Sequence, residues 1–422
     1  MREPLLALHR PYLLSTKGNV INRPHVRARL LLPNLQSTPP TYCRQSARPL
    51  VPYKSSMSQT RSFSTQSADW GPVSTNGTLK APVPARPSSS VLLISPQNEV
   101  LLLHRVSHSS SFAAAHVFPG GHLDAYHGET LPTPPDTRRH EDSEAYRLAA
   151  VRETFEESGI LLVHPLSTSA PSADSHDPLQ LLQLSDDERD SGRKLVHNHK
   201  VLFTEWLNSK GGMADTSGLI PFSHWVTPPN LPKRFTTQMY VYFLPLAHDT
   251  HVPSSTSTSL SSSARESVIP TPTHDGGIEH TAARFAAASE WLELARREKI
   301  ILFPPQFLLL HLIEQFLSPP ARSREEIERQ RESLRRFLHS GDPPWTEKCI
   351  SPIQLMKRKS DGRAVLSLEK PGYELEGTQR RGDGERVVLV EFRKEGPRRV
   401  EVAWRRDVLD EERNGSRSSE KL

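Results

Sequence analysis

The chain has 422 residues, of which 37 are proline, and only 35% of its residues are hydrophobic. This length leaves room for two domains, but the many prolines and a negative mean hydropathy indicate that much of the chain is loop or tail. The two cysteines, Cys43 and Cys349, are too few for a disulfide framework. No run of about 18 apolar residues is present, so the sequence predicts no membrane-spanning helix.

The basic excess lies at the N-terminus. Residues 1–64 contain ten Lys or Arg and one acidic residue, whereas the rest of the chain contains 43 basic and 47 acidic residues. An Arg-rich, Ser-containing and almost acid-free leader is typical of mitochondrial presequences. The segment Arg61-Ser62-Phe63-Ser64 also resembles a presequence processing site. We therefore expect residues 1–64 to be a mitochondrial targeting leader; a disordered basic N-terminus is the alternative.

Two further expectations concern location and partners. The C-terminal Glu420-Lys421-Leu422 resembles the Ser-Lys-Leu peroxisomal signal except at its first position, which makes the peroxisome the alternative location. The slightly acidic body lacks the positive patch that phosphate backbones require, so no nucleic-acid partner is expected.

Taken in chain order, the predicted elements begin after a Pro/Ser/Gly-rich linker at residues 65–88. A hairpin of strands 91–94 and 99–103 is followed by an apolar strand that ends in a glycine turn. A helix then starts after Asp142 or Ser143 and ends at Gly159, with a strand at 160–163 behind it. Further helices are expected in 179–184, 194–207, part of 283–299, 304–316 and 324–339, and further strands at 239–244, 363–368, 386–392 and 399–404.

Three carboxylates lie together in the predicted helix that ends at Gly159. Glu153, Glu156 and Glu157 stand at positions i, i+3 and i+4, which places them on one face, where like charges repel. A divalent cation relieves that repulsion, because Mg²⁺ prefers carboxylate oxygens and often shares its site with substrate phosphates. The alternative is a solvated acidic helix face.

The residues around this helix resemble the Nudix hydrolase family, whose box reads G-x5-E-x7-R-E-U-x-E-E-x-G-U with U apolar. Glu144, the pair Arg152-Glu153, the pair Glu156-Glu157, Gly159 and Ile160 match in register, and Gly121 matches the opening glycine. Thr154 replaces an aliphatic residue, and 22 residues rather than five separate Gly121 from Glu144. The Pro/His/Arg/Glu-rich insertion at 127–141 is expected to be a surface loop.

The likeness extends over roughly residues 88–316 to the branch of nucleoside-diphosphate-linked moiety X type 19 proteins. It rests on the segments 111–124, 152–159, 224–228, 233–237 and 303–307. The resemblance implies an α+β Nudix fold, in which a mixed β-sheet is sandwiched between helices in an α/β/α arrangement. It also implies Mg²⁺- or Mn²⁺-dependent hydrolysis of a diphosphate bond in a small molecule, CoA or acyl-CoA first of all.

The resemblance also implies roles for individual residues. Glu156 and Glu157 would bind the metal, with Glu153 as a third ligand or a water-activating group. Arg152 would pair with Glu144 or a neighbouring carboxylate, and Gly120 and Gly121 would let the backbone approach the metal and phosphate. Two assignments stay open. Lys233, Arg234 and Phe235 form either a substrate-binding group or a basic turn before a strand. The general base could be Glu205, Glu279 or Glu290.

These expectations give four segments. They are a leader at 1–64, a linker at 65–88, a Nudix domain at 89–320 with a low-complexity insertion at 249–275, and a charged helix with a small β-rich appendage at 321–422. Two alternatives to a CoA diphosphatase remain open: a diphosphatase for ADP-ribose, NAD-like or dinucleotide substrates, and a non-catalytic Nudix-fold binding module in mitochondria. The four glutamates and the arginine favour catalysis. The sequence leaves the oligomeric state open.

Overall fold

The computed structural model describes residues 82–106, 114–166, 181–246, 280–319, 321 and 323–419, all within one compact unit, Phe63–Leu422. The expected leader, its processing site, the low-complexity segment 249–275 and the C-terminal tripeptide lie outside the described residues. Among the helices of the described part, none combines the length and the apolar character needed to cross a membrane.

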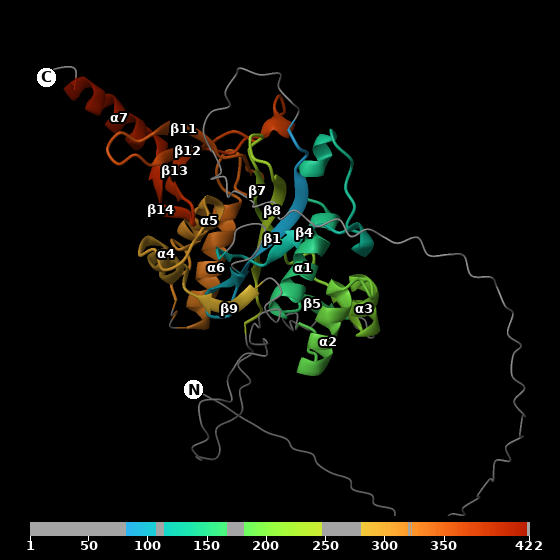
Figure 1. Ribbon diagram of the computed structural model, residues 1–422. Helices are drawn as coiled ribbons and strands as arrows, with labels where there is room; N and C mark the ends of the chain where they lie inside the picture. Colours follow the sequence, from blue (N-terminus) through green and yellow to red (C-terminus); the bar gives the residue numbers. More distant parts are fainter. Residues whose placement is uncertain are drawn as a thin grey trace, which may run out of the picture. The chain divides into compact units, whose positions relative to one another are not determined.

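An eight-stranded mixed sheet forms the centre of the unit (Figure 1). Its strand order is β10-β7-β8-β1-β2-β3, with β4 paired to β1 and β9 paired to β2. The β1/β8 and β10/β7 pairs are parallel and the others antiparallel. The strands are β1 Arg86–Ile94, β2 Val100–Arg105, β3 His116–Val117, β4 Gly120–His122, β7 Ile220–Val226, β8 Phe235–Phe243, β9 His280–Ala286 and β10 Cys349–Ile350.

Helices cover both faces of this sheet. Along β1, Val91 and Leu93 pack in one core with helix α1 (Glu144–Ser158), whereas Leu92 and Ile94 pack in a second core on the opposite face. That second core includes apolar residues of α4 (Ala288–Arg296), α5 (Pro304–Ile313) and α6 (Arg324–Leu338). Strand side chains alternate between faces, so a continuous apolar strand needs cover on both sides. The expected α/β/α arrangement is confirmed (Figure 1).

Helix α1 begins and ends as the sequence predicts. Ser143 adopts the extended conformation of an N-cap, and Gly159 takes the left-handed conformation at φ 75°, donating its N–H to the carbonyl of Phe155. Phe155 is fully buried and stacks on Trp206, with 4.9 Å between the ring centres. This packing fixes the rotation of α1 and therefore the direction in which its acidic face points.

The segment after α1 differs from the prediction. The expected helix at 179–184 is wrong for residues 181–184, which have no regular structure, and the expected helix 194–207 is two helices, α2 (Asp186–His197) and α3 (Phe203–Ser209). His199 separates them because its φ of 53° breaks the helical path. A two-stranded sheet of β5 (Val163–Pro165) and β6 (Gly212–Ala214) lies beside them.

Other elements agree more closely. The β1–β2 hairpin is confirmed, with Ile94 opposite Val100. The expectation that 283–299 is partly helical is confirmed by α4. Residues 283–286 belong to β9, because pairing with β2 decides their conformation. The structure begins its first strand at Arg86, within the segment expected to be linker.

The C-terminal part forms a second sheet and also contributes to the first. Strands β11 (Ile353–Lys357), β12 (Ala364–Leu368), β13 (Asp383–Arg393) and β14 (Gly396–Trp404) form an antiparallel sheet, followed by α7 (Arg405–Ser419). Helix α6 packs Leu334 and Leu338 into the main core, and its buried Arg331 donates to the carbonyls of Ser95 and Leu244. The expected charged helix is thus integrated with the Nudix-like core by its apolar face.

Candidate active site

The acidic face of α1 meets the glycine turn at β4. Gly120 donates its N–H to Glu157 Oε2 at 2.7 Å. A Cβ added to Gly121 would lie 2.4 Å from the carboxyl carbon of Glu153, and one added to Gly120 would lie 2.2 Å from the carbonyl oxygen of Ser89. Both positions therefore need glycine for reasons of space, and the turn brings backbone against two carboxylates that are one helical turn apart.

Arg152 holds the carboxylates of this site together. Its guanidinium, with a side chain 4% exposed, binds Glu129 in a bidentate pair at 2.7 and 2.8 Å, Glu156 at 2.9 Å and Glu153 at 3.0 Å. It also donates to the carbonyl of His122 at 2.8 Å. Burial alone would lower the pKa of Arg152, but the three carboxylates outweigh that effect and hold its pKa well above the usual range.

Arg152 pairs with Glu129 and with its neighbours Glu153 and Glu156, and not with Glu144. Glu144 is exposed at the first residue of α1, eight positions and therefore about 12 Å along the helix from Arg152. Glu129 comes from the insertion between the glycine turn and α1, and its side chain is fully buried. The spacing of the box pointed to Glu144, whereas the inserted loop returns a different carboxylate to the arginine.

The expectation that 127–141 is a surface loop is wrong for part of the segment. His127, Glu129 and His140 are buried, and the insertion contains two short 3-10 turns, Ala125–His127 and Thr137–His140. A polar side chain of the insertion can be buried where it has a partner, and His140 Nδ1 lies 2.7 Å from the hydroxyl of Thr236. Composition alone does not distinguish such a loop from a solvated one.

The three glutamates suit a divalent cation. Burial raises the pKa of Glu153 to about 7, with Glu156 and Glu129 adding to the rise and Arg152 opposing it. A buried carboxylate that is costly to ionise among other carboxylates is stabilised by a hard cation, which takes oxygen ligands. Glu153 and Glu157 face the glycine turn, whereas both oxygens of Glu156 already have partners, Arg152 and His197, at 2.9 and 3.0 Å.

The family-model comparison identifies this region. The model of the NUDT19 Nudix domain matches residues 134–313, which include α1 with its arginine and glutamates. The matched residues form a Nudix domain of the NUDT19-like branch, as the sequence pattern predicts. The observed mixed sheet between helices is the Nudix fold.

Relatives with curated names agree. The acyl-coenzyme A diphosphatase NUDT19 of Gallus gallus is 26% identical over 302 residues, which are 62% of this chain and 72% of that protein. Its namesake in Homo sapiens is also 26% identical, over 57% of this chain and 66% of the relative. A solved structure, a Nudix hydrolase from Alicyclobacillus acidocaldarius, is 20% identical, covers 54% of this chain and 90% of its own, and has a TM-score of 0.38.

In this Nudix domain, the residues expected to grip the substrate do not act as a group. Arg234 is fully buried and binds Glu374 of the C-terminal part at 2.5 and 2.9 Å, so its charge serves a structural ion pair and the prediction is wrong for this residue. Lys233 is exposed. Phe235 stacks on His122 beside the glycine turn, with 5.3 Å between the ring centres, and the carbonyl of His122 accepts from Arg152.

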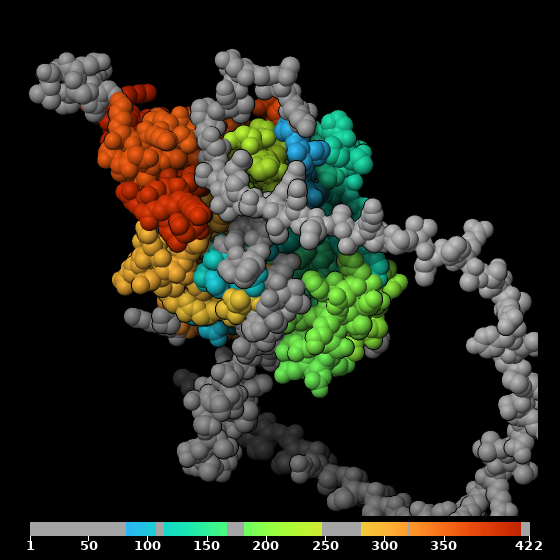
Figure 2. Space-filling model, viewed as in Figure 1, coloured from blue at the N-terminus to red at the C-terminus, as the bar shows by residue number. Residues whose placement is uncertain are grey.

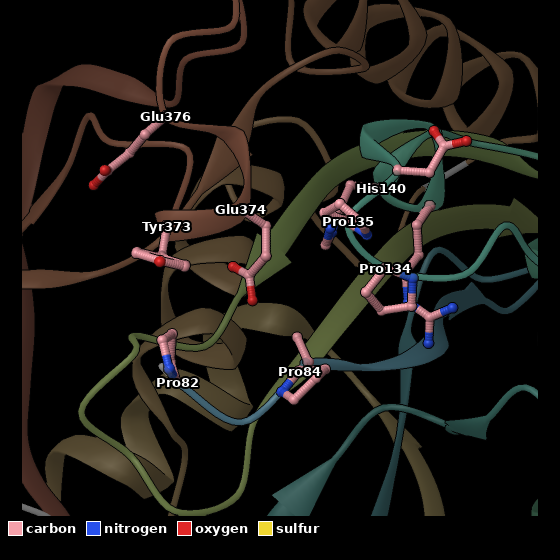
Figure 3. Close-up of a pocket in the computed structure, with 11 residues that line it drawn as sticks. Pro82, Pro84, Pro134, Pro135, His140, Tyr373, Glu374 and Glu376 are labelled. Atoms are coloured by element: carbon pink, nitrogen blue, oxygen red, sulfur yellow. The ribbon is translucent and has the colours of Figure 1, made fainter. Parts of the chain in front are cut away.

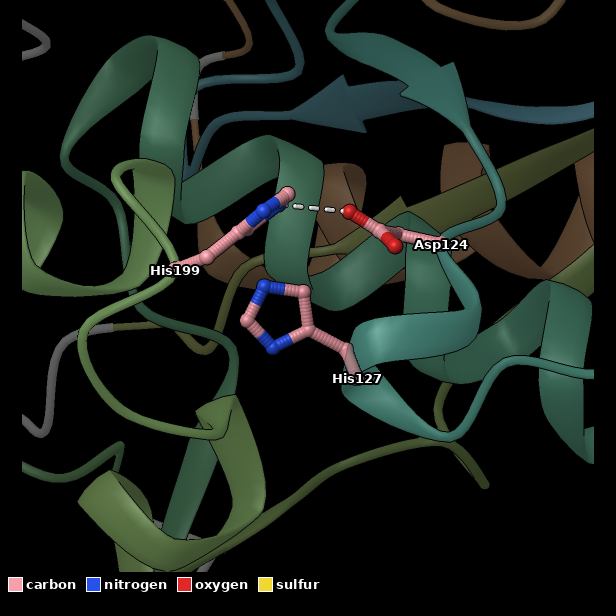
Figure 4. Close-up of side chains that lie close together, drawn as sticks. All are labelled: Asp124, His127 and His199. Carbon is pink, nitrogen blue, oxygen red and sulfur yellow. Dashed lines mark ion pairs between the residues drawn. The ribbon is translucent and has the colours of Figure 1, made fainter. Parts of the chain in front are cut away.

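A second cluster near the Nudix box could also hold a metal by its residue types. Asp124, His127 and His199 place their ligand atoms within 4.8 Å of one another, and His199 Nε2 lies 2.7 Å from Asp124 (Figure 4). However, His127 Nδ1 accepts the backbone N–H of Phe203 at 3.1 Å, so the neutral ring carries its proton on Nε2. A metal bound at Nε2 would have to displace that proton, and this chemistry favours the glutamates of α1 as the metal ligands.

A pocket of about 420 Å³ lies where the box insertion meets the C-terminal part (Figure 3). Prolines and Ala85 form much of its wall, which also includes Tyr373, Glu374, Arg139 and His140. Asp136 and Glu376 are also at its wall, whereas no glutamate of α1 is. The pocket is thus distinct from the carboxylate site, and Glu374 in its wall is the carboxylate that binds Arg234.

The candidates for a general base are distributed as follows. Glu205 is exposed on α3, and Glu290 forms a pair with Arg284 at 2.9 Å on the surface at α4. Glu279 lies just outside the described residues, immediately before the buried His280, whose Nε2 is 3.6 Å from Glu157 Oε1.

Sequence reasoning missed Glu129, Arg193 and His197. Glu129 reaches Arg152 across 23 residues, and His197 reaches Glu156 across 41. None of these three belongs to the box pattern, and a single sequence contains no signal for such long-range pairs. The insertion contains three acidic residues, Glu129, Asp136 and Glu141, and their type alone does not single out Glu129 as the partner of Arg152.

Proposed function

We propose that this protein hydrolyses the diphosphate bond of CoA and acyl-CoA in a reaction that depends on Mg²⁺ or Mn²⁺. The observation that carries the proposal is the convergence of Glu153 and Glu157 on the glycine turn with Arg152 buried among the carboxylates. The substrate class is supported by the names of the relatives, acyl-coenzyme A diphosphatase, at 26% identity. Nudix enzymes in general use divalent metals.

Glu153, Glu156 and Glu157 would hold the cation. When bound, a divalent metal neutralises charge on the diphosphate and lowers the pKa of a water ligand. Mg²⁺ and Mn²⁺ are hard enough to accept a set of carboxylate oxygens and water, which is the donor set that α1 offers. The three glutamates offer only oxygen ligands. A softer metal, which prefers sulfur or nitrogen ligands, therefore has no advantage at this site.

The chain's own residues position the reacting groups. Arg152 fixes Glu153 and Glu156 through ion pairs of 3.0 and 2.9 Å, and the N–H of Gly120 fixes one oxygen of Glu157. Because Gly120 and Gly121 lack side chains, a diphosphate can approach the same backbone. Hydrolysis adds one water across the P–O–P bond and yields two phosphate monoesters, and it needs positioning and charge neutralisation more than covalent catalysis.

Two alternatives differ in what they predict. A diphosphatase for ADP-ribose, NAD-like molecules or dinucleotides would use the same glutamates on another substrate. A non-catalytic binding module has no need of the carboxylates, and their convergence on the glycine turn speaks against it.

The test is product analysis with the full chain. We would incubate it with Mg²⁺ or Mn²⁺ and CoA, acyl-CoA esters, ADP-ribose, NAD and dinucleotides, and identify products by mass in water enriched in ¹⁸O. We expect CoA to yield adenosine 3′,5′-bisphosphate and 4′-phosphopantetheine, with the label on one phosphate. Glu157→Gln is the control. Cleavage of ADP-ribose in preference to every CoA compound would replace the proposed substrate, and cleavage of no compound would favour the binding module.

For location we propose mitochondrial import, with cleavage of the leader near Arg61-Ser62-Phe63-Ser64. The support is the basic, almost acid-free composition of residues 1–64. N-terminal sequencing of protein from purified matrix should find a start between residues 63 and 73. A C-terminally tagged protein found in peroxisomes would support the alternative address, and intact Met1 in the matrix would contradict the cleavage site.

A further inference from the structure

Helix α2, which lies outside the Nudix box, contacts the metal face of α1 at two points. Arg193 donates from Nε and Nη2 to the carbonyl of Glu156 at 3.0 and 2.9 Å, and from Nη2 to the carbonyl of Glu157 at 3.2 Å. These are carbonyls in the last turn of α1, where no intrahelical partner is available and a cation is favourable. Arg193 therefore ties the backbone of the two adjacent glutamates to α2.

The second contact is to a carboxylate itself. His197, the last residue of α2, places Nδ1 3.0 Å from Glu156 Oε2, while Glu156 Oε1 accepts from Arg152 Nη1 at 2.9 Å. A carboxylate accepts hydrogen bonds, so Nδ1 is the nitrogen of His197 that carries the proton here. The carboxylate of Glu156 thus lies between two donors from different helices, and its side-chain rotamer is fixed.

Helix α2 does not need His197 to stay in place. The ring of Trp206 occupies the space in which a Cβ on Gly192 would lie, at 2.1 Å, and the same ring stacks on Phe155 of α1. Ser185 and Glu188 form a capping box at the start of α2. The side chain of His197 is 42% exposed, and α2 lies at the surface in the green region of Figure 2. Its removal leaves the packing between the helices intact.

We propose that His197 is a positioning residue that holds Glu156 in the orientation needed for metal binding. The inference rests on the metal site of the proposed function, and it adds a residue that the Nudix box does not contain. A group that hydrogen-bonds a metal-binding carboxylate sets its orientation and basicity, and loss of such a group costs about 10- to 100-fold in metal affinity or activity.

The test is direct Mn²⁺ binding to the full chain without substrate, measured by electron paramagnetic resonance of free Mn²⁺ and by calorimetry. The variants are His197→Ala, His197→Asn and the control Lys194→Ala. An asparagine amide nitrogen lies close to the place of the histidine Nδ1 and keeps a donor for Glu156, whereas alanine removes it. Lys194 is exposed on the same helix, one turn before His197, and its side chain has no part in the site.

We expect His197→Ala to bind Mn²⁺ about 10- to 100-fold more weakly, His197→Asn to recover most of the affinity, and Lys194→Ala to bind as the wild type does. Thermal unfolding of the apo proteins should coincide, which separates positioning from a structural role. With substrate, His197→Ala should regain most of its kcat at saturating Mn²⁺, with KM for the substrate unchanged.

Several outcomes overturn the inference. They are wild-type affinity in His197→Ala, equal loss in His197→Asn and His197→Ala, and no Mn²⁺ binding by the wild type at millimolar concentrations. Failure of the proposed function looks different. A wild-type protein that binds Mn²⁺ in a His197-dependent way but leaves CoA and acyl-CoA intact contradicts the substrate and supports the role of His197.

Discussion

The acidic segment of α1 and the basic segment at the start of β8 are both short clusters of charge beside an aromatic residue, yet they have opposite fates. Glu153 and Glu157 converge on a glycine turn, where a ligand with the opposite charge can approach. Arg234 is instead buried with its own partner, Glu374, at 2.5 Å. The acidic cluster retains a charge that the fold does not neutralise fully, whereas the basic cluster has its charge neutralised within the chain.

The difference follows from the number of like charges and from their partners. Three carboxylates on one helix face exceed what one guanidinium can neutralise, and burial raises the pKa of Glu153 to about 7. Arg234, by contrast, is a single charge. It donates to the carboxylate of Glu374 and to several backbone carbonyls, which together satisfy its guanidinium. Charge that remains after internal pairing is therefore a better indicator of a site for a charged ligand than a cluster of charged residues in the sequence.

The largest effect on catalysis is expected from removing one charge of the acidic cluster. Glu157→Gln should lower kcat by roughly two to three decades, the cost typical of losing one group that stabilises charge in the transition state. Stability should change little, because the amide relieves repulsion among the glutamates and still accepts from Gly120. Steady-state kinetics at saturating Mg²⁺, with unfolding curves as the control, test this; near-normal turnover would remove Glu157 from the site.

The internal partner of the acidic cluster gives the next effect, on stability. Glu129→Ala leaves the buried guanidinium of Arg152 without its bidentate carboxylate and should cost about 3 to 5 kcal/mol of unfolding free energy. Glu144→Ala is the matched control, since Glu144 is exposed and should change stability by less than about 0.5 kcal/mol. Urea unfolding of both variants decides between them: equal effects would contradict the assignment of Glu129.

How far the sequence could predict these regions depends on the range of the contacts. The ends of α1, the β1–β2 hairpin and the acidic face follow from local residues, because caps, turns and helical spacing act within a few positions. Glu129 and Glu374 lie 23 and 140 residues from the arginines they bind, and only the folded chain brings them there. Residues 283–286 became a strand because β2 offered an edge, which local propensity does not record.

The basic segment should show the reverse of the acidic one, a loss of stability without a loss of catalysis. Glu374→Ala should cost about 2 to 3 kcal/mol, below the full cost of breaking a buried pair because the side chain of Glu374 is 20% exposed. Lys233→Ala should stay within about 0.5 kcal/mol. With both proteins folded at low temperature, kcat should equal that of the wild type. A fall in kcat for Glu374→Ala in folded protein would return Arg234 to the substrate site.

The smallest effect concerns a histidine that lies between the two segments. His224 packs edge-on against Tyr146 of α1 and lies 2.6 Å from the hydroxyl of Thr236 on β8. Complete burial lowers its pKa from 6.5 to about 3, with a hydrogen bond to Gln238 opposing the shift. The folded state therefore holds this ring neutral, while the unfolded chain takes up a proton once the pH falls below 6.5.

The sign of the pH dependence follows directly. The stabilisation that depends on neutral His224 is fully present above pH 6.5 and is lost as the pH falls towards 3, at about 1.4 kcal/mol per pH unit. Between pH 6.5 and pH 5 the loss should be about 2 kcal/mol. His224→Gln removes the titrating group and should make this slope shallower by that amount. His116 and His127, whose pKa values burial lowers to about 4, contribute equally to both proteins. Urea unfolding at several pH values measures the two slopes, and parallel slopes would show that His224 is not the group that couples acid to unfolding.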